Sequence, residues 1–509
     1  MSDKFVNYDS VSDLGDKVPD LKKYLRPGEK VISVYEAEPH SFKELPNYIE
    51  ELSKLCGVEK AEDIGKKGAP IAATSIQKDL GQGLFECKFG RDGLIAARNL
   101  LAEFPDLARA TLLDYATRIG MIEERLREEE FGRMFHEDRK ASDPIARKLS
   151  GKMGWEWPFY ATVDATPLFV NLLYEYLVTS AEGAAFLREK YIGRNGKTYT
   201  ILDALYFSMS WIISRLNRNP EKFLEYKPAF SKSLHNQVME DSWDSHFHSD
   251  GTMPNFRQGI ASTEAQGLTY DALIRAARII KQDVGVDPEA EYFLKLAEQL
   301  KSNIFKHLWI KDGEKGFFAV GTDRNKWGNV RPLKVQKAIP FFLLNSDIFS
   351  DKTAQKIKII EDCIHTLFTQ NFLCAAGIRS LALNEQRFMP SAYHNGSSWP
   401  MQTFEIANGL RKQGYPALAN ELDERIISAV EKVNIYPEFF YGGQEKEVRL
   451  VTRIVETYDP LDKKINRREQ PAQQIQLWTL SAYAAIKYRQ RTGSNISYQP
   501  FEAEILSRI

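Results

Sequence analysis

The stretch Ser233–Gly251 gathers acidic and histidine side chains that could do chemistry together. Its carboxylates are Glu240, Asp241, Asp244 and Asp250, and its histidines are His235, His246 and His248. A zinc site needs three or four ligands that converge with fixed geometry. The spacing of His246 and His248 suits a strand, whereas the residues around them are typical of a loop. We therefore expect no metal here, and either one half of an acid–base pair or a polar loop.

Four other segments collect the same residue types between apolar stretches. They are Glu86–Leu94, Met153–Pro167, Ala375–Pro400 and Asn434–Gly443. Hydrolysis of a glycosidic bond needs two carboxyl groups, one to protonate the leaving oxygen and one to attack or to activate water. Sugar hydroxyls need Arg, Asp, Asn or His partners, and the apolar face of a sugar needs Trp or Tyr. A single loop of this kind is more often structural, whereas five in one chain indicate a carbohydrate pocket.

Helical periodicity indicates how these loops are positioned. From about residue 92 onward, apolar residues recur at spacings of three and four, which is typical of amphipathic helices. The segments with this pattern are 92–104, 108–122, 164–181, 200–216, 262–280, 289–305, 354–368, 399–414, 417–433 and 471–491. Alternating strands are few, and Gly316–Thr322 is one candidate for a short hairpin. The pattern predicts an all-α toroid over residues 86–509, with residues 1–85 as an N-terminal extension packed on it.

The bulk composition argues against several classes of function. Lys and Arg (68) balance Asp and Glu (69), so the chain has no overall basic footprint for nucleic acid. The longest apolar run, Ala338–Leu344, is far shorter than the roughly 20 residues of a membrane span. The four cysteines form no CxxC pair, and the N-terminus lacks the regions of a secretion signal. We expect reduced thiols and a cytoplasmic location.

Six motifs carry a resemblance to a known family. They are FGRDGL (89–94), TVDATPLF (162–169), NQVMEDSWDS (236–245), TEAQGLTYDAL (263–273), YHNGSSWP (393–400) and PEFFYG (437–442). In this order they resemble the bacterial glycogen-debranching-type amylo-α-1,6-glucosidases. Those enzymes belong to the six-hairpin (α/α)6-barrel glycosidases, with glucoamylases and mannosylglycerate hydrolases. The resemblance covers about residues 85–490 and implies an (α/α)6 barrel that cleaves an α-glucosidic or related α-glycosidic bond with inversion.

The resemblance also implies roles for individual residues. Asp241 takes the place of the general acid and Glu438 that of the general base. Arg91 and Asp92 match the pair expected to hold the outer hydroxyls of the terminal sugar. The rest of the expected pocket is Trp157, Asp164, Gln237, Trp243, Glu264, His394, Asn395 and Trp399. We expect a carbohydrate substrate, no cofactor and no metal, and the oligomeric state stays open.

Several of these residues have a structural alternative. Asp92 and Asp164 could cap the helices that follow them. Arg91 could be a structural ion-pair partner, and Glu264 could complement a helix dipole from its first turn. Trp399 could belong to the core. Glu445, Glu447 and Glu469 are rivals for the base, but they lie in charge-rich segments that look solvated.

The chain departs from the resemblance directly before the expected acid. Val238–Glu240 stands where Gly-Trp-Lys is usual, which removes an aromatic residue and reverses a charge. A short α-glucoside, or a glycoside of a small acid or polyol (the glucosylglycerate or mannosylglycerate type), is therefore an equal alternative. Arg379 and Arg387 could meet an anionic leaving group. A sugar epimerase or isomerase with convergent histidines, a phosphorylase and an inactive sugar-binding protein remain as other classes.

Overall fold

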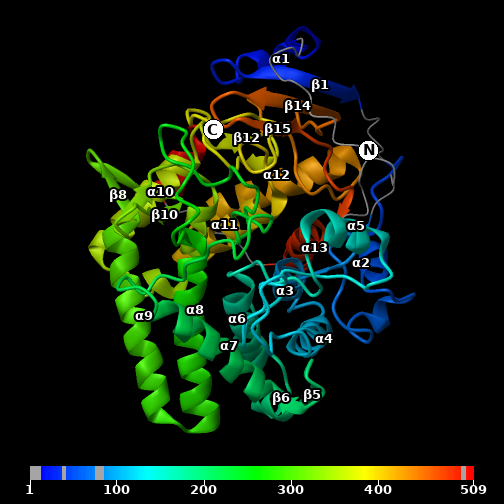
Figure 1. Cartoon of the computed structure of the whole chain (residues 1–509), viewed down its shortest axis with the longest axis vertical. Helices are drawn as coiled ribbons and strands as arrows, with labels where there is room; N and C mark the ends of the chain where they lie inside the picture. The colour runs from blue at the N-terminus through cyan, green and yellow to red at the C-terminus, as the bar shows by residue number, and fades with distance from the viewer. Residues whose placement is uncertain (1–12, 37–41, 75–84, 494–499) are drawn as a thin grey trace.

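Six helical segments form a closed ring in the computed structural model, which describes residues 13–36, 42–74, 85–493 and 500–509 (Figure 1). In chain order the ring consists of α3 (Gly90–Asn99), α6 (Ala165–Thr179), α8 (Thr263–Ile279), the 3₁₀ helix η6 (Ile339–Asn345), α11 (Pro400–Gln413) and α13 (Leu477–Thr492). Each segment contacts the next, and α13 contacts α3 and closes the ring. The order matches the predicted toroid.

Further helices surround this ring. They are α4 (Pro105–Ala116), α7 (Ile201–Leu216), α9 (Asp287–His307), α10 (Ala354–Leu367), α12 (Pro416–Val433) and α2 (Tyr48–Leu55). The first five each follow one inner segment along the chain, and α2 packs on α13. The shorter helices are α1 (Pro19–Lys22), α5 (Pro144–Met153), α14 (Pro500–Leu506), η2 (Gly15–Lys17), η3 (Ala61–Asp63), η4 (Gly183–Arg188), η7 (Asp347–Phe349) and the π-helical turn η5 (Ile280–Val284).

Local sequence signals set where several helices begin and end. At the start of α7, the Thr200 hydroxyl accepts from the Asp203 N–H, and the Asp203 carboxylate accepts from the Thr200 N–H, which is a capping box. Helix α11 begins at Pro400 and ends before Gly414, whose φ is +96°. Helix α13 begins at Leu477, later than the predicted residue 471, because the residues before it build a loop and a short strand.

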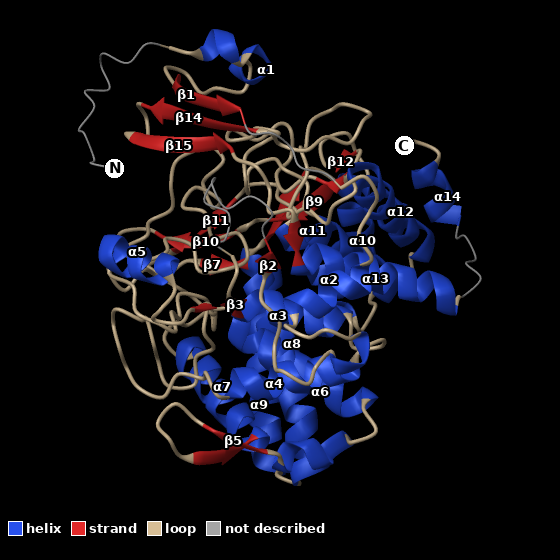
Figure 2. Cartoon of the chain, turned by 90° about the vertical axis from the view of Figure 1, so that its right-hand side faces the viewer, coloured by secondary structure: helices blue, strands red, loops and turns tan. Residues whose placement is uncertain are grey.

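The prediction of a purely all-α chain is wrong because short strands pair the loops between the helices. The strands are β1 (Lys30–Glu36), β2 (Ala73–Thr74), β3 (Lys88–Phe89), β4 (Glu137–Asp138), β5 (Lys190–Ile192), β6 (Thr198–Thr200), β7 (Ala261–Ser262), β8 (Trp309–Asp312), β9 (Lys315–Phe318), β10 (Gly321–Arg324), β11 (Val330–Leu333), β12 (Leu373–Cys374), β13 (Gly377–Ile378), β14 (Arg453–Asp459), β15 (Lys464–Glu469) and β16 (Ile475–Gln476). Figure 2 shows most of them at one end of the ring. Long loops there must satisfy their backbone groups, and pairing does so.

The strands form small sheets rather than one layer. The three-stranded sheets have the orders β1-β14-β15 and β11-β10-β7, and the two-stranded sheets pair β12 with β13, β16 with β2, β3 with β4, β5 with β6, and β8 with β9. The candidate hairpin Gly316–Thr322 is divided, because β9 pairs with β8 whereas β10 pairs with β11 and β7. The all-α prediction missed these strands because most are too short to show an alternating pattern.

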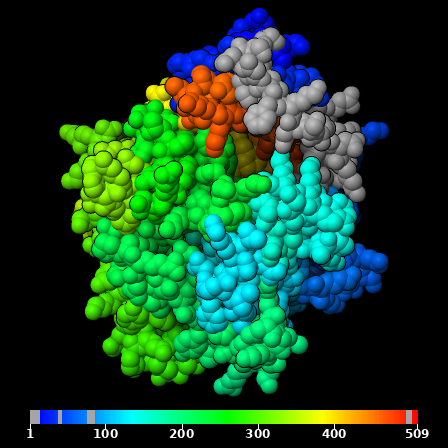
Figure 3. Space-filling view, in the orientation of Figure 1, coloured from blue at the N-terminus to red at the C-terminus, as the bar shows by residue number. Residues whose placement is uncertain are grey.

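The N-terminal residues join a sheet with residues near the C-terminus. Strand β1 runs antiparallel to β14, with Lys30 opposite Tyr458 and Glu36 opposite Arg453. Arg26 Nη1 lies 2.8 Å from Asp459 Oδ2. In Figure 3 the blue N-terminal atoms lie beside the orange atoms of β14 and β15. A domain boundary at residue 85 would divide this sheet, and parts of the predicted extension (1–12, 37–41 and 75–84) lie outside the described residues.

The described part of the chain has a large buried core and buried thiols. One apolar cluster runs through the ring, and a second joins α2, α12 and α13. Cys56, Cys87, Cys363 and Cys374 are buried and unpaired. Within the described ranges, no helix is both long and apolar enough to cross a bilayer.

Candidate active site

A cavity of about 340 Å³ lies at the end of the ring where the inner helices begin. The predicted residues Arg91, Asp92, Asp241, His394 and Glu438 line it. Their neighbours in the lining include Phe85, Phe89, Ile145, Lys148, Leu149, Met239, Tyr393, Ile454, Arg467, Gln470, Pro471, Gln473, Gln476 and Trp478. In Figure 3 the surface is hollowed beneath the orange β14–β15 atoms. The structure therefore brings two carboxyl groups that are distant in the sequence into one cavity.

Two glycines let the loops around this cavity approach one another closely. A Cβ added to Gly90 would lie 2.0 Å from the Phe135 carbonyl oxygen, and one added to Gly442 would lie 1.8 Å from that of Gly396. Neither distance is compatible with a side chain. Gly90 is the first residue of α3, directly before Arg91 and Asp92, and Gly442 closes the loop that carries Glu438. These motif glycines allow the close packing of backbone that the site needs.

Asp241 presents its carboxyl group to the cavity. Its side chain is 26% exposed, and within the described residues no hydrogen bond to the carboxyl is made by another side chain. Arg91 Nη2 lies 3.6 Å from Asp241 Oδ2, and His136 Nε2 lies 3.9 Å away. Burial raises the pKa of Asp241 to about 6, although Arg91 opposes this and Asp164 adds to it. A carboxyl that accepts no hydrogen bond from another side chain and has a raised pKa can give a proton to a ligand.

Glu438 is more enclosed and is held by donors on both oxygens. The Tyr393 hydroxyl donates to Oε1, and the Gln473 N–H donates to Oε2 over 3.4 Å. The residue is 2% exposed, and burial raises its pKa to about 8 while the Tyr393 hydrogen bond opposes the rise. The pKa of Tyr393 is well above its ordinary value because of burial and the nearby carboxylate. Tyr393 therefore stays a donor, and Glu438 is placed as an acceptor.

Arg91 belongs to a buried chain of charges as well as to the cavity. Its Nε lies 2.9 Å from Asp164 Oδ2, and its Nη2 is 3.4 Å from His136 Nδ1. Asp164 accepts from the Thr162 hydroxyl and caps no backbone N–H of α6 with its side chain. Glu264 accepts from the Ser262 hydroxyl at 2.9 Å. Burial next to Asp164 raises the pKa of Glu264 well above its ordinary range.

Asp92 faces the cavity and does not cap α3. The residue at the N-cap of that helix is Phe89, and Asp92 is 4% exposed. Burial raises its pKa to about 7, Arg91 lowers it, and the negative charge of Asp241 raises it further. Asp92 is therefore a polar group in the cavity wall that is available to a sugar hydroxyl.

Five of the predicted pocket residues lie in the surrounding scaffold. Gln237 accepts from Arg133 at 2.7 Å and donates to Glu128 at 2.8 Å, and Trp157 donates to the Ser150 hydroxyl at 3.1 Å. The Asn395 side chain donates to the Asp244 carbonyl at 3.0 Å. Trp399 is fully buried and stacks on His394 at 5.2 Å. Trp243 lines a smaller hollow of about 150 Å³ that shares Tyr393, His394, Arg467 and Gln470 with the main cavity.

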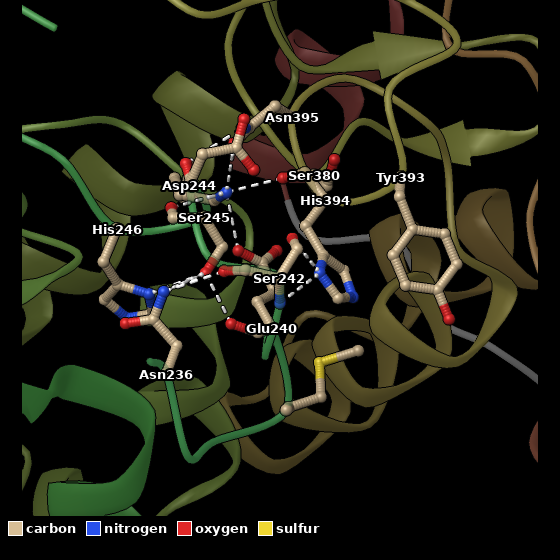
Figure 4. Close-up of polar contacts among 12 residues, drawn as sticks. Asn236, Glu240, Ser242, Asp244, Ser245, His246, Ser380, Tyr393, His394 and Asn395 are labelled. Carbon is tan, nitrogen blue, oxygen red and sulfur yellow. Dashed lines mark hydrogen bonds and ion pairs between the residues drawn. The ribbon is translucent and has the colours of Figure 1, made fainter. Parts of the chain in front are cut away.

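The unusual Glu240 turns away from the cavity. It is fully buried, and its Oε2 lies 2.6 Å from Lys337 Nζ while its Oε1 accepts from Gln402 at 2.9 Å. Burial raises the pKa of Glu240 to about 6, and Lys337 opposes the rise. Figure 4 shows Glu240 among Ser242, Ser245, His394 and Asn395. The reversed charge beside Asp241 is thus matched by a buried lysine.

The other candidate residues have structural partners. Arg379 donates to the Gly443 carbonyl at 2.6 Å, and Arg387 lies 2.9 Å from Asp462. Glu445 and Glu469 pair with Arg449 and Arg453. His235 packs against Phe256, His246 contacts the Ser245 hydroxyl and His248 lies 3.2 Å from Asp323. Within the described part of the chain, no group of three His, Cys, Asp or Glu residues is arranged to hold a metal ion.

Some residues of the site did not emerge from the sequence. Tyr393 stands beside His394 in the YHNGSSWP motif, so its place there was a usable signal. Gln473 and Gln476 lie in the amide-rich run before α13, which looked like helix. His136 and Lys337 carried no signal, because nothing in their local sequence separates them from ordinary polar residues. The pKa of His136 lies well below its ordinary value because of burial and nearby arginines, so it is neutral.

A second cavity of about 440 Å³ lies at the opposite end of the ring. All six inner segments line it, and its cations are Arg98, Arg275 and Arg489. Arg98 contacts Glu405, Arg275 lies 2.8 Å from Glu175, and Arg489 lies 2.8 Å from Asp423. Segment η6 has seven residues, whereas α8 has seventeen, so the wall of the ring is short between α8 and α11. Because each arginine in the larger cavity is paired with a carboxylate, we interpret this cavity as structural.

Comparisons with known proteins identify the family and the fold of the chain. The profile of the mannosylglycerate hydrolase MGH1-like glycoside hydrolase domain matches residues 113–466. The fold is similar to that of the GH63 mannosylglycerate hydrolase from Thermus thermophilus in complex with Tris and D-glycerate. The TM-score is 0.54 at 12% identity, over 87% of this chain and 100% of that one.

Two further structures give the same picture. The same Thermus thermophilus enzyme in complex with Tris gives a TM-score of 0.53 at 13% identity, over 87% and 100% of the chains. A bacterial glucoamylase complexed with acarbose gives 0.50 at 14% identity, over 87% of this chain and 55% of that one. No curated protein sequence gives a significant match. The chain therefore belongs to the MGH1-like glycoside hydrolase family and has the fold of the six-hairpin glycosidases.

Proposed function

We propose that the protein hydrolyses an α-glycosidic bond with inversion, with Asp241 as the general acid and Glu438 as the general base. The observation that carries this proposal is the pair of carboxyls in one cavity with opposite surroundings. Asp241 is free of hydrogen-bond donors from other side chains in the described residues, whereas Glu438 has donors on both oxygens. A free carboxyl suits the donation of a proton, and a carboxylate with fixed donors suits the acceptance of one.

Each group has one step in this mechanism. The Asp241 carboxyl protonates the glycosidic oxygen as the bond to the anomeric carbon breaks. Glu438 accepts a proton from a water that attacks the anomeric carbon from the other face, so the configuration inverts. The Tyr393 hydroxyl keeps Glu438 oriented. We expect the two carboxyls to be separated by roughly 6.5–9.5 Å, which leaves room for that water.

The proton balance of the pair limits the working pH. The pKa is about 6 for Asp241 and about 8 for Glu438. Between about pH 6 and pH 8, the two carboxyls therefore hold one proton between them. The proton is then mostly on Glu438, and about one molecule in a hundred has it on Asp241. Only that form is competent if Asp241 is the acid. Exchange of the two roles would give the same pH limits, so the roles must be separated by variants and leaving groups.

The cavity wall supports a small substrate with an anionic leaving group over a glycogen branch. Arg467 and Lys148 line the cavity, and Arg467 also lines the smaller hollow beside it. The ion pair of Arg467 with Glu456, at 3.1 Å, is open to solvent, so a ligand can compete for this arginine. Arg379, Arg387 and Arg468 are buried and held by structural partners. A cavity of about 340 Å³ is near the lower end of the range for small-molecule sites. We therefore favour a hexose joined by an α-bond to a small carboxylic acid.

The epimerase or isomerase alternative has less support. That chemistry would need convergent histidines, and of His235, His246, His248 and His394 only His394 is in the lining of the main cavity. The pKa of His394 lies well below its ordinary value because burial and nearby cations disfavour its charged form. A neutral, stacked histidine is more suited to a hydrogen bond than to the exchange of protons with a sugar.

A screen of α-glucosides and α-mannosides with glycerate, glucosyl and nitrophenyl leaving groups tests the proposal. The released sugar is followed by NMR during the first minutes of the reaction. We expect the β-anomer to form first and a glycerate-type glycoside to be the best substrate. First release of the α-anomer would show retention and would refute the mechanism. Efficient release of glucose from branched dextrins would refute the substrate assignment.

A further inference from the structure

A buried lysine joins the loop that carries Asp241 to the loop that carries Tyr393, the hydrogen-bond partner of Glu438. Lys337 is fully buried and stands directly before η6. Its Nζ lies 2.6 Å from Glu240 Oε2 and donates to the carbonyls of Ser245 at 3.1 Å and His394 at 2.5 Å, and to Asn395 Oδ1 at 3.0 Å. The ammonium group thus has two contacts on each loop.

On one side these contacts fix the peptide that carries Asp241. Glu240, which precedes Asp241, is held by Lys337 and by Gln402 of α11. Ser242, which follows Asp241, contacts His394 Nδ1 through its hydroxyl at 2.6 Å. Figure 4 shows Glu240, Ser242 and His394 together at the centre of this network. The backbone of Asp241 is therefore anchored on both sides, while its carboxyl group stays free in the cavity.

On the other side the contacts reach the neighbours of the base. Lys337 binds the His394 carbonyl, and Tyr393, the residue before His394, donates to Glu438. The Glu438 loop has anchors of its own. Its N–H donates to the Gln473 carbonyl at 2.9 Å, and the Thr479 hydroxyl donates to the Pro437 carbonyl at 2.7 Å. Loss of Lys337 would therefore release the acid more than the base.

Stability alone does not explain this pair. Burial of two charges is expensive, and an ion pair in a core is often no more stabilising than apolar residues of the same size. Glu240 is also where the chain departs from the Lys expected by resemblance. The feature that apolar residues could not supply is the set of directed contacts from one ammonium group to both loops.

We propose that Lys337 and Glu240 are positioning residues, which set the place of the Asp241 carboxyl relative to Glu438. The inference rests on the proposed function, because it assumes that Asp241 protonates the leaving group. The proposal explains why a negative charge, Glu240, stands directly before Asp241: it pairs with Lys337 and so helps to fix the position of Asp241. A displacement of the acid by about 1 Å is enough to cost about 10²-fold in rate.

The test compares leaving groups that need the acid with one that does not. Methyl α-glycosides require protonation of the leaving oxygen, whereas α-glucosyl and α-mannosyl fluorides leave as fluoride without it. For Lys337→Met we expect kcat on the methyl glycoside to fall about 30- to 100-fold and kcat on the fluoride to fall less than about fivefold. KM should change little, because Lys337 does not reach the cavity. Equal losses on both substrates would overturn the proposal.

Further variants separate position from folding. The double variant Glu240→Gln with Lys337→Met leaves no unpaired buried charge, so it should fold if either single variant does not. We expect it to keep the selective loss on the methyl glycoside. The exchanged pair Glu240→Lys with Lys337→Glu restores the ion pair but gives no donor to the two carbonyls, and it too should stay slow. If both double variants keep the wild-type ratio of kcat on the methyl glycoside to kcat on the fluoride, the positioning role is refuted.

Arg411→Met is the matched control. Arg411 contacts Asp423 in a largely buried pair at the last turn of α11, away from the cavity. Its loss should lower the melting temperature and leave the ratio of rates on methyl glycoside and fluoride unchanged. A selective loss in this variant as well would show that the ratio reports general instability, and would overturn the proposal. If the wild-type protein hydrolyses neither substrate class, the proposed function fails instead, which is a separate outcome.

Discussion

The two ends of the helical ring differ in how far the charged side chains that line their cavities are paired with opposite charges. At the end where the inner helices finish, the larger cavity holds arginines that each contact a carboxylate, namely Arg98, Arg275 and Arg489. At the end where they begin, Asp92, Asp241 and Glu438 share a smaller cavity, and burial raises all three pKa values. The larger cavity is also lined by Glu264 and Asp271, whose pKa values burial raises too. The comparison therefore teaches that neither cavity size nor a raised pKa alone selects the candidate site. The smaller cavity is chosen because it brings together Asp241 and Glu438, two carboxyls from separate motif loops.

The largest expected effect is the loss of the acid at the catalytic end. Asp241→Asn should lower kcat on methyl or glycerate α-glycosides by about 10²–10⁴-fold, since general acid catalysis contributes that much. The melting temperature should stay near that of the wild type, because Asp241 has few partners. Activity on the α-glycosyl fluorides should survive. If Glu438→Gln keeps fluoride activity and Asp241→Asn does not, the two roles are reversed.

At the opposite end, the same kind of change should affect stability and not rate. Glu405→Gln removes the negative charge that pairs with the mostly buried Arg98, while its amide oxygen can still accept from Asn345. We expect the free energy of unfolding to fall by about 3 kcal/mol, because an unpaired charge is left in the interior. Urea denaturation measures this, and kcat per folded molecule serves as the control. If the variant were as stable as the wild type but had a lower kcat, the claim that this end contributes to stability and not to catalysis would be wrong.

Removal of the tyrosine donor should change both rate and pH dependence. Wild-type activity should be highest between about pH 6 and 8, because below that range Glu438 is protonated together with Asp241, and above it neither carboxyl holds a proton. Tyr393→Phe removes a hydrogen bond that favours ionised Glu438, so the pKa of Glu438 should rise and the alkaline limit should move upward.

The same variant should lower the maximal kcat about tenfold, the worth of a hydrogen bond to a charged group. The measurement is kcat against pH for both proteins. An alkaline limit that moves down, or does not move, would show that the upper pKa does not belong to Glu438. Ser391→Ala, a change in the same loop at a buried hydroxyl outside the cavity lining, should leave the profile in place.

The smallest effect is expected at the rim of the cavity. Arg467→Gln should raise KM about three- to tenfold for a substrate with an anionic leaving group and leave KM for the methyl glycoside unchanged. A partly exposed charge pair is worth about 1 kcal/mol, and the difference should shrink at high salt. Arg449→Gln, which breaks an exposed pair with Glu445, is the control and should change neither KM. Equal effects on both substrates would argue against recognition of an anion.

The sequence predicts the helices and the motif loops better than it predicts what the side chains in those loops touch. Periodicity predicted most of the paired helices, and the ordered motifs predicted that Asp241 and Glu438 share one cavity, while their catalytic roles stay predictions. The sequence could not predict which way the Glu240 side chain points, because this depends on its ion pair with Lys337. Lys337 is far from Glu240 in the chain, and its local sequence gives no sign of the contact. Gln237 was expected in the pocket because of its place in the NQVMEDSWDS motif. Its contacts with Arg133 and Glu128 are set by tertiary packing, which spacing does not report.

The pairing of β1 with β14 has a consequence for the order in which the protein can mature. Strands 30–36 and 453–459 must meet before this sheet exists, and α13 must reach α3 before the ring closes. Contacts between residues so far apart in the chain form slowly, because a long loop must be closed first. Ile454 of β14 and Gln476 before α13 also line the catalytic cavity. On the ribosome, therefore, the candidate active-site cavity cannot be completed until residues 453–476 have emerged.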